Sequence, residues 1–384
     1  MNSASRRILG RAARGVFVGA LASGAIGAVA QQESPPMADD VFKNIQVLRG
    51  LTVDEFMSTM GFISASLSMN CSDCHDPTNA ASYATDNPRK QVARRMIVMV
   101  DALNKANFGG RRQVTCYSCH RGADRPKITP SLAEQYGPPL GDDPNEVELS
   151  PIPRPTASSA DQVFDRYLQA LGGAQSLAAL NSFVARGTYV GFDTLGDNVP
   201  VDIYAKAPNQ RTTVVHLGSG AAENVRVFDG RNGWNTSTGT LMPIPVVPLT
   251  GGALEGAKLE AALSFPDQIK QLLKDWRTDF PSTTIDGRAV DGVQGTQADN
   301  TPVKFYFDRE TGLLLRLFRY TNTRLGFNPT QIDYADYRTV AGVKLPFKLT
   351  TTWTDGRSII ELSELRANAP VDAARFARPV PPAR

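Results

Sequence analysis

Two short motifs of cysteine and histidine contain the residues of this chain that are best suited to chemistry. Residues 71–75 (CSDCH) and 116–120 (CYSCH) share the pattern C-x-x-C-H, and they use all four cysteines and two of the three histidines. Two thiols at this spacing can bond to the two vinyl groups of one haem, and the adjacent histidine can ligate its iron. The sequence therefore predicts two covalently attached c-type haems, with these protein ligands: Cys71, Cys74 and His75 for the first, and Cys116, Cys119 and His120 for the second.

Paired cysteines also occur in zinc sites and in thiol–disulfide centres. The gap between Cys74 and Cys116 is wider than the usual spacing of a zinc ribbon or finger. Neither a zinc site nor a redox-active disulfide requires a histidine directly after each pair. The repeated histidine therefore favours haem attachment.

The N-terminal segment has the composition of an export signal. Four arginines surround the start of an apolar run from Gly15 to Gly27, and a small-residue cleavage pattern ends at Ala30. We expect a signal peptide over residues 1–30 and a periplasmic mature protein, because haem is attached to such motifs outside the cytoplasm. Without the four arginines, the formal net charge of +3 becomes 3 − 4 = −1. The mature chain therefore has no global basic character that would indicate nucleic-acid binding.

A proline-rich stretch divides the remainder of the chain. Eight prolines lie between residues 126 and 155, a density that suits an extended linker and excludes a helix or a central strand. The sequence thus predicts a multidomain protein with four segments: a signal peptide (1–30), a mainly α dihaem cytochrome c domain (31–125), a linker (126–159) and an α+β domain (160–384).

The haem segment contains a short internal repeat. Thr52 with Glu55 predicts a capping box at the start of one helix, and Asn87-Pro88 predicts the start of a second. Their apolar stripes have the same spacing, and each helix precedes one C-x-x-C-H motif; the stripes are Phe56, Met60, Ile63, Leu67 and Val92, Met96, Met99, Leu103. The second member of both stripes is methionine, so Met60 and Met96 are the predicted sixth ligands of the two irons. Met57 and Met99 remain as alternative ligands. A structural alternative is that these methionines only pack in the apolar core and ligate no iron.

These residues resemble the cytochrome c subunit of photosynthetic reaction centres. The resemblance runs from about Val41 to Pro126 and rests on residues 55–60 (EFMSTM), 93–96 (ARRM) and 114–122 (VTCYSCHRG), together with the first motif. In that family a helical methionine precedes each motif and ligates that haem, which again implies Met60 and Met96. The family usually has four haems, whereas this chain resembles one half of the subunit. The family's distal-haem histidine has no counterpart between Asn107 and Thr115.

The segment after the linker has a different pattern. A helix is expected over Asp161–Leu171 and another over about Leu254–Leu273. The remainder predicts short strands separated by turns such as Asp229-Gly230 and Asp286-Gly287, with these expected ranges: 183–189, 199–205, 212–217, 225–228, 303–307, 313–320, 330–337, 343–353 and 358–365. This order predicts a curved antiparallel sheet or half-open β-barrel. The segment resembles the LolA/LolB type of periplasmic lipoprotein carrier, which implies an apolar cavity.

The motifs favour a periplasmic electron carrier that exchanges single electrons with redox partner proteins, and they indicate an electron carrier rather than an enzyme. One alternative is a haem redox enzyme or sensor that acts on a hydrophobic substrate. A second alternative is a lipid or lipoprotein carrier with an appended cytochrome. A lipid or quinone-like apolar ligand and peripheral membrane association fit the second domain. His216, its one histidine, is expected to be structural or exposed.

Overall fold

The structure is a computed structural model. It describes residues 34–76, 78–130, 158–218, 222–236, 244–278, 283–354 and 356–381. The predicted signal peptide and most of the predicted linker lie outside these residues. Pro35–Arg384 form one compact unit, and within it we refer to residues 34–130 as the helical region and to residues 158–381 as the β region.

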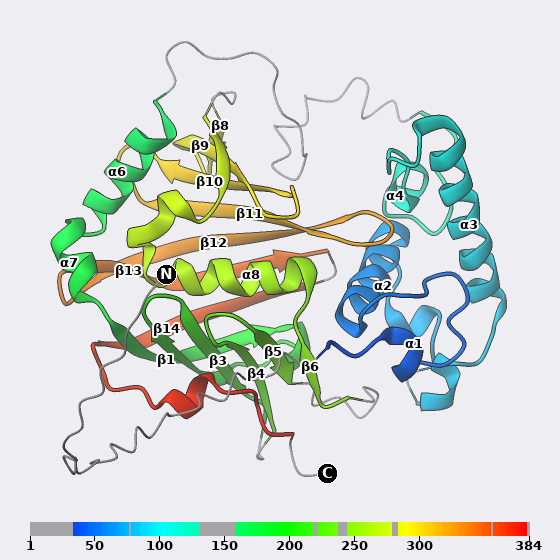
Figure 1. The fold of residues 1–384 in the computed structure, drawn as a ribbon, viewed down its shortest axis with the longest axis horizontal. Coiled ribbons are helices and arrows are strands. Elements are labelled where there is room, and N and C mark those ends of the chain that lie inside the picture. The colour runs from blue at the N-terminus through cyan, green and yellow to red at the C-terminus, as the bar shows by residue number, and fades with distance from the viewer. Residues whose placement is uncertain are drawn as a thin grey trace, which may run out of the picture. The chain divides into compact units, whose positions relative to one another are not determined.

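The helical region contains two main helices and several short ones (Figure 1). Its elements are α1 (Ala38–Val41), α2 (Val53–Leu67), η1 (Cys71–Asp73), η2 (Ala80–Tyr83), α3 (Pro88–Phe108) and α4 (Cys116–His120). Thr52 caps α2 with the capping box expected with Glu55, and Asn87 caps α3 with Pro88 in its first turn. Both predicted helix starts are therefore confirmed.

The β region is built on one large antiparallel sheet (Figure 1). In the described part of the chain, the 14-stranded sheet has the order β6-β5-β4-β3-β2-β1-β14-β13-β12-β11-β10-β9-β7, and β8 pairs with β9. The strands are β1 (Ser182–Gly191), β2 (Val199–Lys206), β3 (Gln210–His216), β4 (Glu223–Phe228), β5 (Gly233–Thr236), β6 (Val246–Pro248), β7 (Lys274–Arg277), β8 (Thr283–Ile285), β9 (Arg288–Thr296), β10 (Pro302–Asp308), β11 (Leu314–Asn322), β12 (Phe327–Val340), β13 (Val343–Trp353) and β14 (Gly356–Ala367). The predicted antiparallel sheet is confirmed.

Helices cover one face of this sheet. They are α6 (Ala160–Ala170), α7 (Gly173–Ala179), α8 (Gly251–Ala262) and the short η4 (Pro266–Gln271), and η5 (Ala373–Phe376) follows the last strand. Helix α8 contacts β3 and β4 near one end of the strand order and β11 near the other, so the sheet curves around it. The helix expected over residues 254–273 is in fact two helices. Pro266 lacks a backbone N–H and begins a new helical segment, so α8 ends at Ala262.

Five strands, β5 to β9, were not expected from the sequence. Four of them are only three or four residues long, and β9 contains Gly292 and Gly295, which weaken a strand pattern. The structure explains Gly295: a Cβ there would lie 2.6 Å from Cζ3 of Trp276. Close packing of an aromatic ring on the strand therefore requires glycine at this position.

The hairpin between β11 and β12 joins the two regions. Leu325 at its tip is 2% exposed and packs in one apolar cluster with Leu48, Phe62 and Ile97 of the helical region. A Cβ at Gly326 would lie 2.1 Å from Cζ of Phe62, so the tip approaches α2 closely. The hairpin thus completes the core of the helical region.

Polar contacts surround this docked tip. The Asn328 side chain donates to the Ser58 carbonyl at 2.8 Å, and Arg112 donates to the Thr323 carbonyl. At the start of α2, the Thr250 N–H donates to Asp54 Oδ2 at 2.9 Å. Burial raises the pKa of Asp54 above its usual value, and the Thr250 N–H and Arg226 oppose this rise. These contacts hold α2 against the β region.

Candidate cofactor-attachment site

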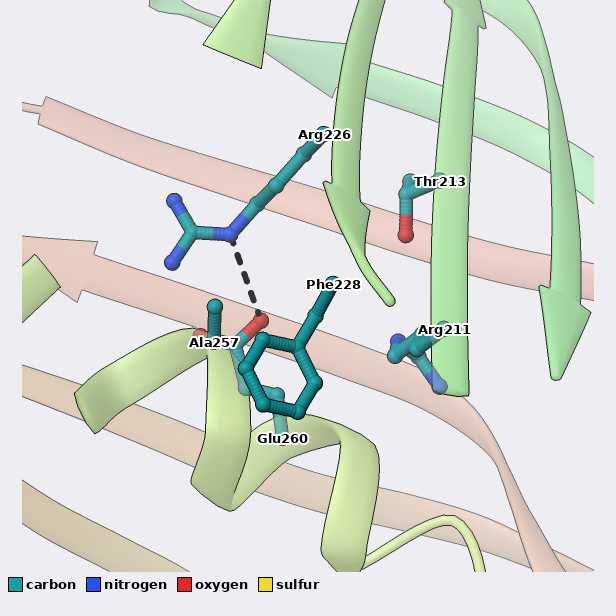
Figure 2. Close-up of a pocket in the computed structure, with 6 residues that line it drawn as sticks. All are labelled: Arg211, Thr213, Arg226, Phe228, Ala257 and Glu260. Carbon is teal, nitrogen blue, oxygen red and sulfur yellow. Dashed lines mark ion pairs between the residues drawn. The ribbon is translucent and has the colours of Figure 1, made fainter. Parts of the chain in front are cut away.

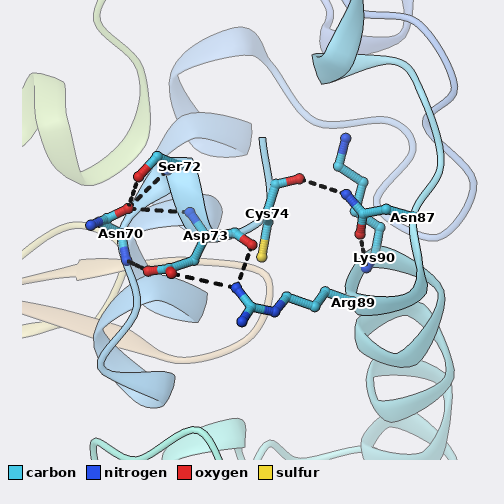
Figure 3. A network of polar contacts seen from close by, with 7 residues as sticks. All are labelled: Asn70, Ser72, Asp73, Cys74, Asn87, Arg89 and Lys90. Carbon is cyan, nitrogen blue, oxygen red and sulfur yellow. Dashed lines mark hydrogen bonds and ion pairs between the residues drawn. The ribbon is translucent and has the colours of Figure 1, made fainter. Parts of the chain in front are cut away.

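The first C-x-x-C-H motif forms a tight turn that its own residues cap. The Asn70 side chain accepts from Ser72 N–H at 2.9 Å and from Asp73 N–H at 3.2 Å, while Asp73 accepts from Asn70 N–H at 2.9 Å. The His75 N–H donates to the Cys71 carbonyl at 2.8 Å. The turn η1 and the two residues after it therefore present both thiols and the imidazole from one short segment. Figure 3 shows the polar contacts of Asn70, Ser72 and Asp73 that cap this turn.

The start of α3 holds this turn in place (Figure 3). The Asn87 side chain donates to the Cys74 carbonyl at 2.8 Å and accepts from Lys90 N–H at 3.0 Å. Arg89 donates to the Asp73 carbonyl at 2.6 Å. Asn87 thus caps α3 and anchors the motif with the same amide group.

His75 is held by an aromatic neighbour. Its ring stacks on Tyr83, with centroids 4.6 Å apart and an interplanar angle of 16°. Burial, with a smaller contribution from nearby Lys90, lowers the pKa of His75, which favours the neutral imidazole that metals bind. Its Nδ1 is buried, and no hydrogen-bond partner is found for it in the described part of the chain.

The second motif is the short helix α4, and Asn104 of α3 positions it. The Asn104 side chain is 6% exposed. It donates to the Val114 carbonyl at 2.7 Å and accepts from the N–H groups of Gln113 and Val114 at 3.0 and 2.9 Å. Three hydrogen bonds from one side chain therefore fix the segment that leads into Cys116. Sequence reasoning missed this residue, although a polar residue on the apolar side of a helix was an available signal.

His120 has a defined orientation. Its Nδ1 lies 3.0 Å from the Ala123 carbonyl. A carbonyl can only accept, so Nδ1 carries the proton and the lone pair is on Nε2. The chain reverses directly after the motif, because Arg121 and Gly122 have φ angles of 50° and 72°. The Gly122 N–H then donates to the Ser66 carbonyl of α2 at 3.1 Å.

The four cysteines, all within the described residues, form no disulfide with one another. Cys71 and Cys119 are exposed, whereas Cys74 and Cys116 are partly covered. Burial raises the pKa of the Cys74 and Cys116 thiols, so both are protonated at neutral pH. Each motif thus has one accessible and one sheltered thiol.

The predicted methionine ligands occupy different surroundings. Met60 packs on the cluster that contains Phe62, and Cys116 of the second motif packs on the same cluster. Met96 is partly exposed, and the alternatives Met57 and Met99 are 40% and 49% exposed. The pairing of the methionines with the two motifs remains a prediction.

The helical region exposes several large apolar side chains near the motifs. Besides Met57 and Met99 they are Tyr83, Val92, Val98 and Tyr117, which are 38–56% exposed. Only Ile97, Val100 and Asn104 of α3 are buried. A large flat apolar group bonded to the thiols could cover such surfaces. His120, whose Nδ1 donates to the Ala123 carbonyl, keeps the Nε2 lone pair that could ligate iron, and the lowered pKa of His75 favours the neutral imidazole that a metal requires. The residues present therefore fit covalent haem.

Several basic residues near α3 are already engaged. Lys90 donates to the Ser82 and Thr85 carbonyls at 2.6 and 2.8 Å. Arg94 pairs with Asp86, and Arg112 bonds the β11–β12 hairpin. Arg95 and Lys105 are exposed.

His216 lies on β3 between two carboxylates. Its Nε2 is 3.1 Å from Asp202 Oδ2, and its Nδ1 is 3.0 Å from Glu223 Oε1. Both ring nitrogens are thus engaged, as expected for a structural residue. In the described ranges, no group of three or more His, Cys, Asp or Glu side chains is arranged to hold a metal ion. Among the same residues, no helix has the length and apolar character needed to span a membrane.

Comparison with solved structures places the β region near several proteins of low sequence identity. A LolA superfamily protein from Nitrosomonas europaea is 12% identical, covers 58% of this chain and 98% of its own, and has a TM-score of 0.39. A DUF1329 family protein from Desulfovibrio piger is also 12% identical, covers 57% of this chain and 98% of its own, and has a TM-score of 0.39. At these scores the likeness adds nothing about function.

The sequence comparisons concern the helical region. The family model of the photosynthetic reaction centre cytochrome c subunit matches residues 20–141. The subunit of Thermochromatium tepidum is 42% identical over 103 residues, which are 26% of this chain and 25% of that protein. The subunit of Roseobacter denitrificans is 36% identical over 98 residues, 23% of this chain and 26% of that protein. The chain thus spans about a quarter of the length of these relatives. The N-terminal part of this chain resembles the cytochrome c subunit of photosynthetic reaction centres, as predicted from its motifs.

Proposed function

We propose that this protein is a periplasmic dihaem c-type cytochrome that transfers single electrons between partner proteins. The observation that carries the proposal is that one helix, α3, holds both C-x-x-C-H motifs. Asn87 and Arg89 at its start bind the first motif, and Asn104 near its end binds the segment before the second. At 1.5 Å per residue, the two asparagines lie about 25 Å apart along the helix. One rigid element would therefore set the separation of two cofactors.

The residues have distinct roles in this proposal. Cys71, Cys74, Cys116 and Cys119 bond the two haems, and His75 and His120 ligate the irons through Nε2. The sixth ligands are Met60 and Met96. Bound haem supplies a reversible one-electron couple, and a thioether opposite histidine raises its reduction potential. Tyr83 and the Ala123 carbonyl hold the two imidazoles in orientation.

The relatives' printed name, cytochrome c subunit, supports covalent haem in the helical region. Their alignments cover about a quarter of each relative, so the partner of this chain is a separate question. We propose soluble redox proteins as partners. We also propose the division into a cytochrome domain (31–125), a linker (126–159) and a β domain (160–384), with the β11–β12 hairpin as the docking point.

Absorption spectroscopy of the purified protein tests the proposal. We expect two haems per chain by pyridine haemochrome, low-spin spectra in both oxidation states, and no binding of carbon monoxide to the reduced protein. Met60→Ala and Met96→Ala should each open one iron to carbon monoxide, whereas the neighbouring Met57→Ala and Met99→Ala should not. Carbon monoxide binding at both haems of the wild-type protein would refute methionine ligation. A haem count other than two would refute the dihaem assignment.

The interior of the β region does not favour an apolar carrier as a second function. Large side chains fill the space between the helices and the sheet; the fully buried ones include Phe164, Phe305, Phe307, Leu317 and Ile269. Aromatic contacts link Phe164 with Phe307 at 5.9 Å and with Trp276 at 4.7 Å. We therefore propose that this part of the β region is a packed support for the cytochrome.

A further inference from the structure

Three arginines of the β region converge on one side chain of α8. Arg211 and Thr213 are two positions apart on β3 and therefore lie on the same face of the sheet. Arg226 of β4 lies directly opposite Thr213 in the antiparallel ladder, so its side chain is on that face too. Helix α8 covers this face and contributes Ala257 and Glu260 (Figure 2). Arg319 reaches the same glutamate from β11, on the other half of the curved sheet.

A glycine in α8 makes room for the third arginine. A Cβ at Gly256 would lie 2.4 Å from Cζ of Arg319, and even alanine would displace the guanidinium. Gly252, one turn earlier, is similarly close to Thr321, where a Cβ would lie 2.8 Å from the Cα atom. Helix α8 therefore lies directly on β11, with the Arg319 guanidinium held beneath it.

The cluster has more positive than negative charge. Glu260 lies 3.5 Å from Arg319 and 3.9 Å from Arg226, while Arg211 donates to Ser264 Oγ at 2.8 Å. Three guanidinium groups and one carboxylate leave a net charge of 3 − 1 = +2. Asp54 also acts on Arg226, and counting it as ionised still leaves 3 − 2 = +1.

Part of this positive charge lacks a partner. Arg319 is 8% exposed, and its Nε is buried with no hydrogen-bond partner in the described part of the chain. Burial lowers the pKa of Arg211 and of Arg319, although Glu260 opposes this effect. Buried charges and donors are costly unless they are paired. An anion at this place would satisfy them.

We propose that Arg211, Arg226 and Arg319 form a binding site for an oxyanion, a phosphate or carboxylate group. Guanidinium groups match both groups through paired N–H donors. A cavity lined by Arg211, Arg226 and Glu260 measures about 10 Å³, enough for about one water molecule or one ligand oxygen. Arg319 does not line this cavity itself but contacts Glu260 at its wall. Arg226 and Glu260 are 32% and 29% exposed, so the site reaches solvent and the rest of the ligand can extend outward. The site is independent of the proposed haems.

Isothermal titration of the full-length holoprotein tests this site. Sodium phosphate and sodium acetate are titrated separately, with sodium chloride at equal ionic strength as the reference. We expect saturable binding of at least one oxyanion at one site per chain, with no change in the haem spectrum. Phosphate binding alone assigns a phosphate group, and acetate binding alone assigns a carboxylate. Absence of saturable binding of both would overturn the proposal.

Two variants locate the binding. Arg319→Gln should weaken it about 10- to 100-fold, the range expected for loss of a hydrogen bond to a charged group. Arg316→Gln is the matched control, because Arg316 lies three positions away on the opposite face of β11 and pairs with Asp333. The control should bind as the wild type does. Equal weakening in both variants would overturn the site. If Arg319→Gln does not fold, Arg226→Gln, at a partly exposed position, gives the same test.

Discussion

Replacement of Asn104 by alanine should destabilise the attachment segment of the second motif. The wild-type side chain makes three hydrogen bonds to the backbone of Gln113 and Val114. At a net value of about 1 kcal/mol each, their loss should lower the free energy of unfolding by about 3 kcal/mol. Access of water to the exposed Gln113 would reduce the loss to about 2 kcal/mol, because its N–H can then be solvated.

Urea unfolding of the holoprotein, followed in the far ultraviolet and at the Soret band, measures this loss. Asn107→Ala is the control, since Asn107 lies on the same helix, is exposed, and donates to the Leu103 carbonyl of its own helix at 3.0 Å. It should cost less than about 0.5 kcal/mol. Hydrogen exchange at the Gln113 and Val114 amides should accelerate in Asn104→Ala alone. Equal unfolding midpoints and unchanged exchange in the two variants would refute the role assigned to Asn104.

Three further predictions concern the helical region and its contact with the hairpin. Leu325→Ala should lower the free energy of unfolding in urea by about 2–5 kcal/mol, because it empties a buried position between the regions. The control Arg324→Ala removes an exposed 3.0 Å ion pair with Asp101 and should lower it by less than about 1 kcal/mol. Similar decreases in the two variants would contradict docking by the hairpin. Tyr83→Ala should lower the free energy of unfolding by about 0.5–1.5 kcal/mol, because the ring that stacks on His75 is lost, whereas Tyr83→Phe should retain this stacking. A decrease in stability as large in Tyr83→Phe as in Tyr83→Ala would argue against stacking. Asp54→Asn should raise the thermal midpoint at pH 7. Because the pKa of Asp54 is raised in the folded state, its stabilising form is the protonated one, and that form is lost as pH rises from the ordinary pKa of 3.8 through the raised pKa. The difference from wild type should shrink as pH falls toward 3.8, and a constant difference across that range would contradict burial as the cause.

Local signals in the sequence were reliable where the chain makes its own contacts. The Thr52–Glu55 capping box and the Asn87-Pro88 start were read correctly because a helix cap involves residues only three positions apart. The Asp286-Gly287 turn was likewise visible, since both residues adopt positive φ angles of 49° and 77°. The long β-branched and aromatic strands were also predicted, whereas the short strands β5 to β8 carry too few residues to show a period.

The apolar stripes were less informative about burial. Val92 and Met99 of the predicted stripe on α3 are 44% and 49% exposed, while the neighbouring Ile97 and Val100 are buried. A stripe identifies an apolar face, but the packing partners decide how much of it is covered. Here the partner of Ile97 includes Leu325, which is 228 positions away (325 − 97). No pattern within a helix contains that information.

The sequence alone therefore determined the two C-x-x-C-H motifs, the order of the helices before them, and an antiparallel sheet after a proline-rich stretch. These features depend on residues that are close together in the sequence, and local backbone geometry acts over such short separations. Only the tertiary structure decided that α3 holds both motifs, that the β11–β12 hairpin enters the helical core, and that three arginines meet Glu260. Each of these depends on contacts between segments distant in the chain, where packing and charge compensation among many groups select the arrangement.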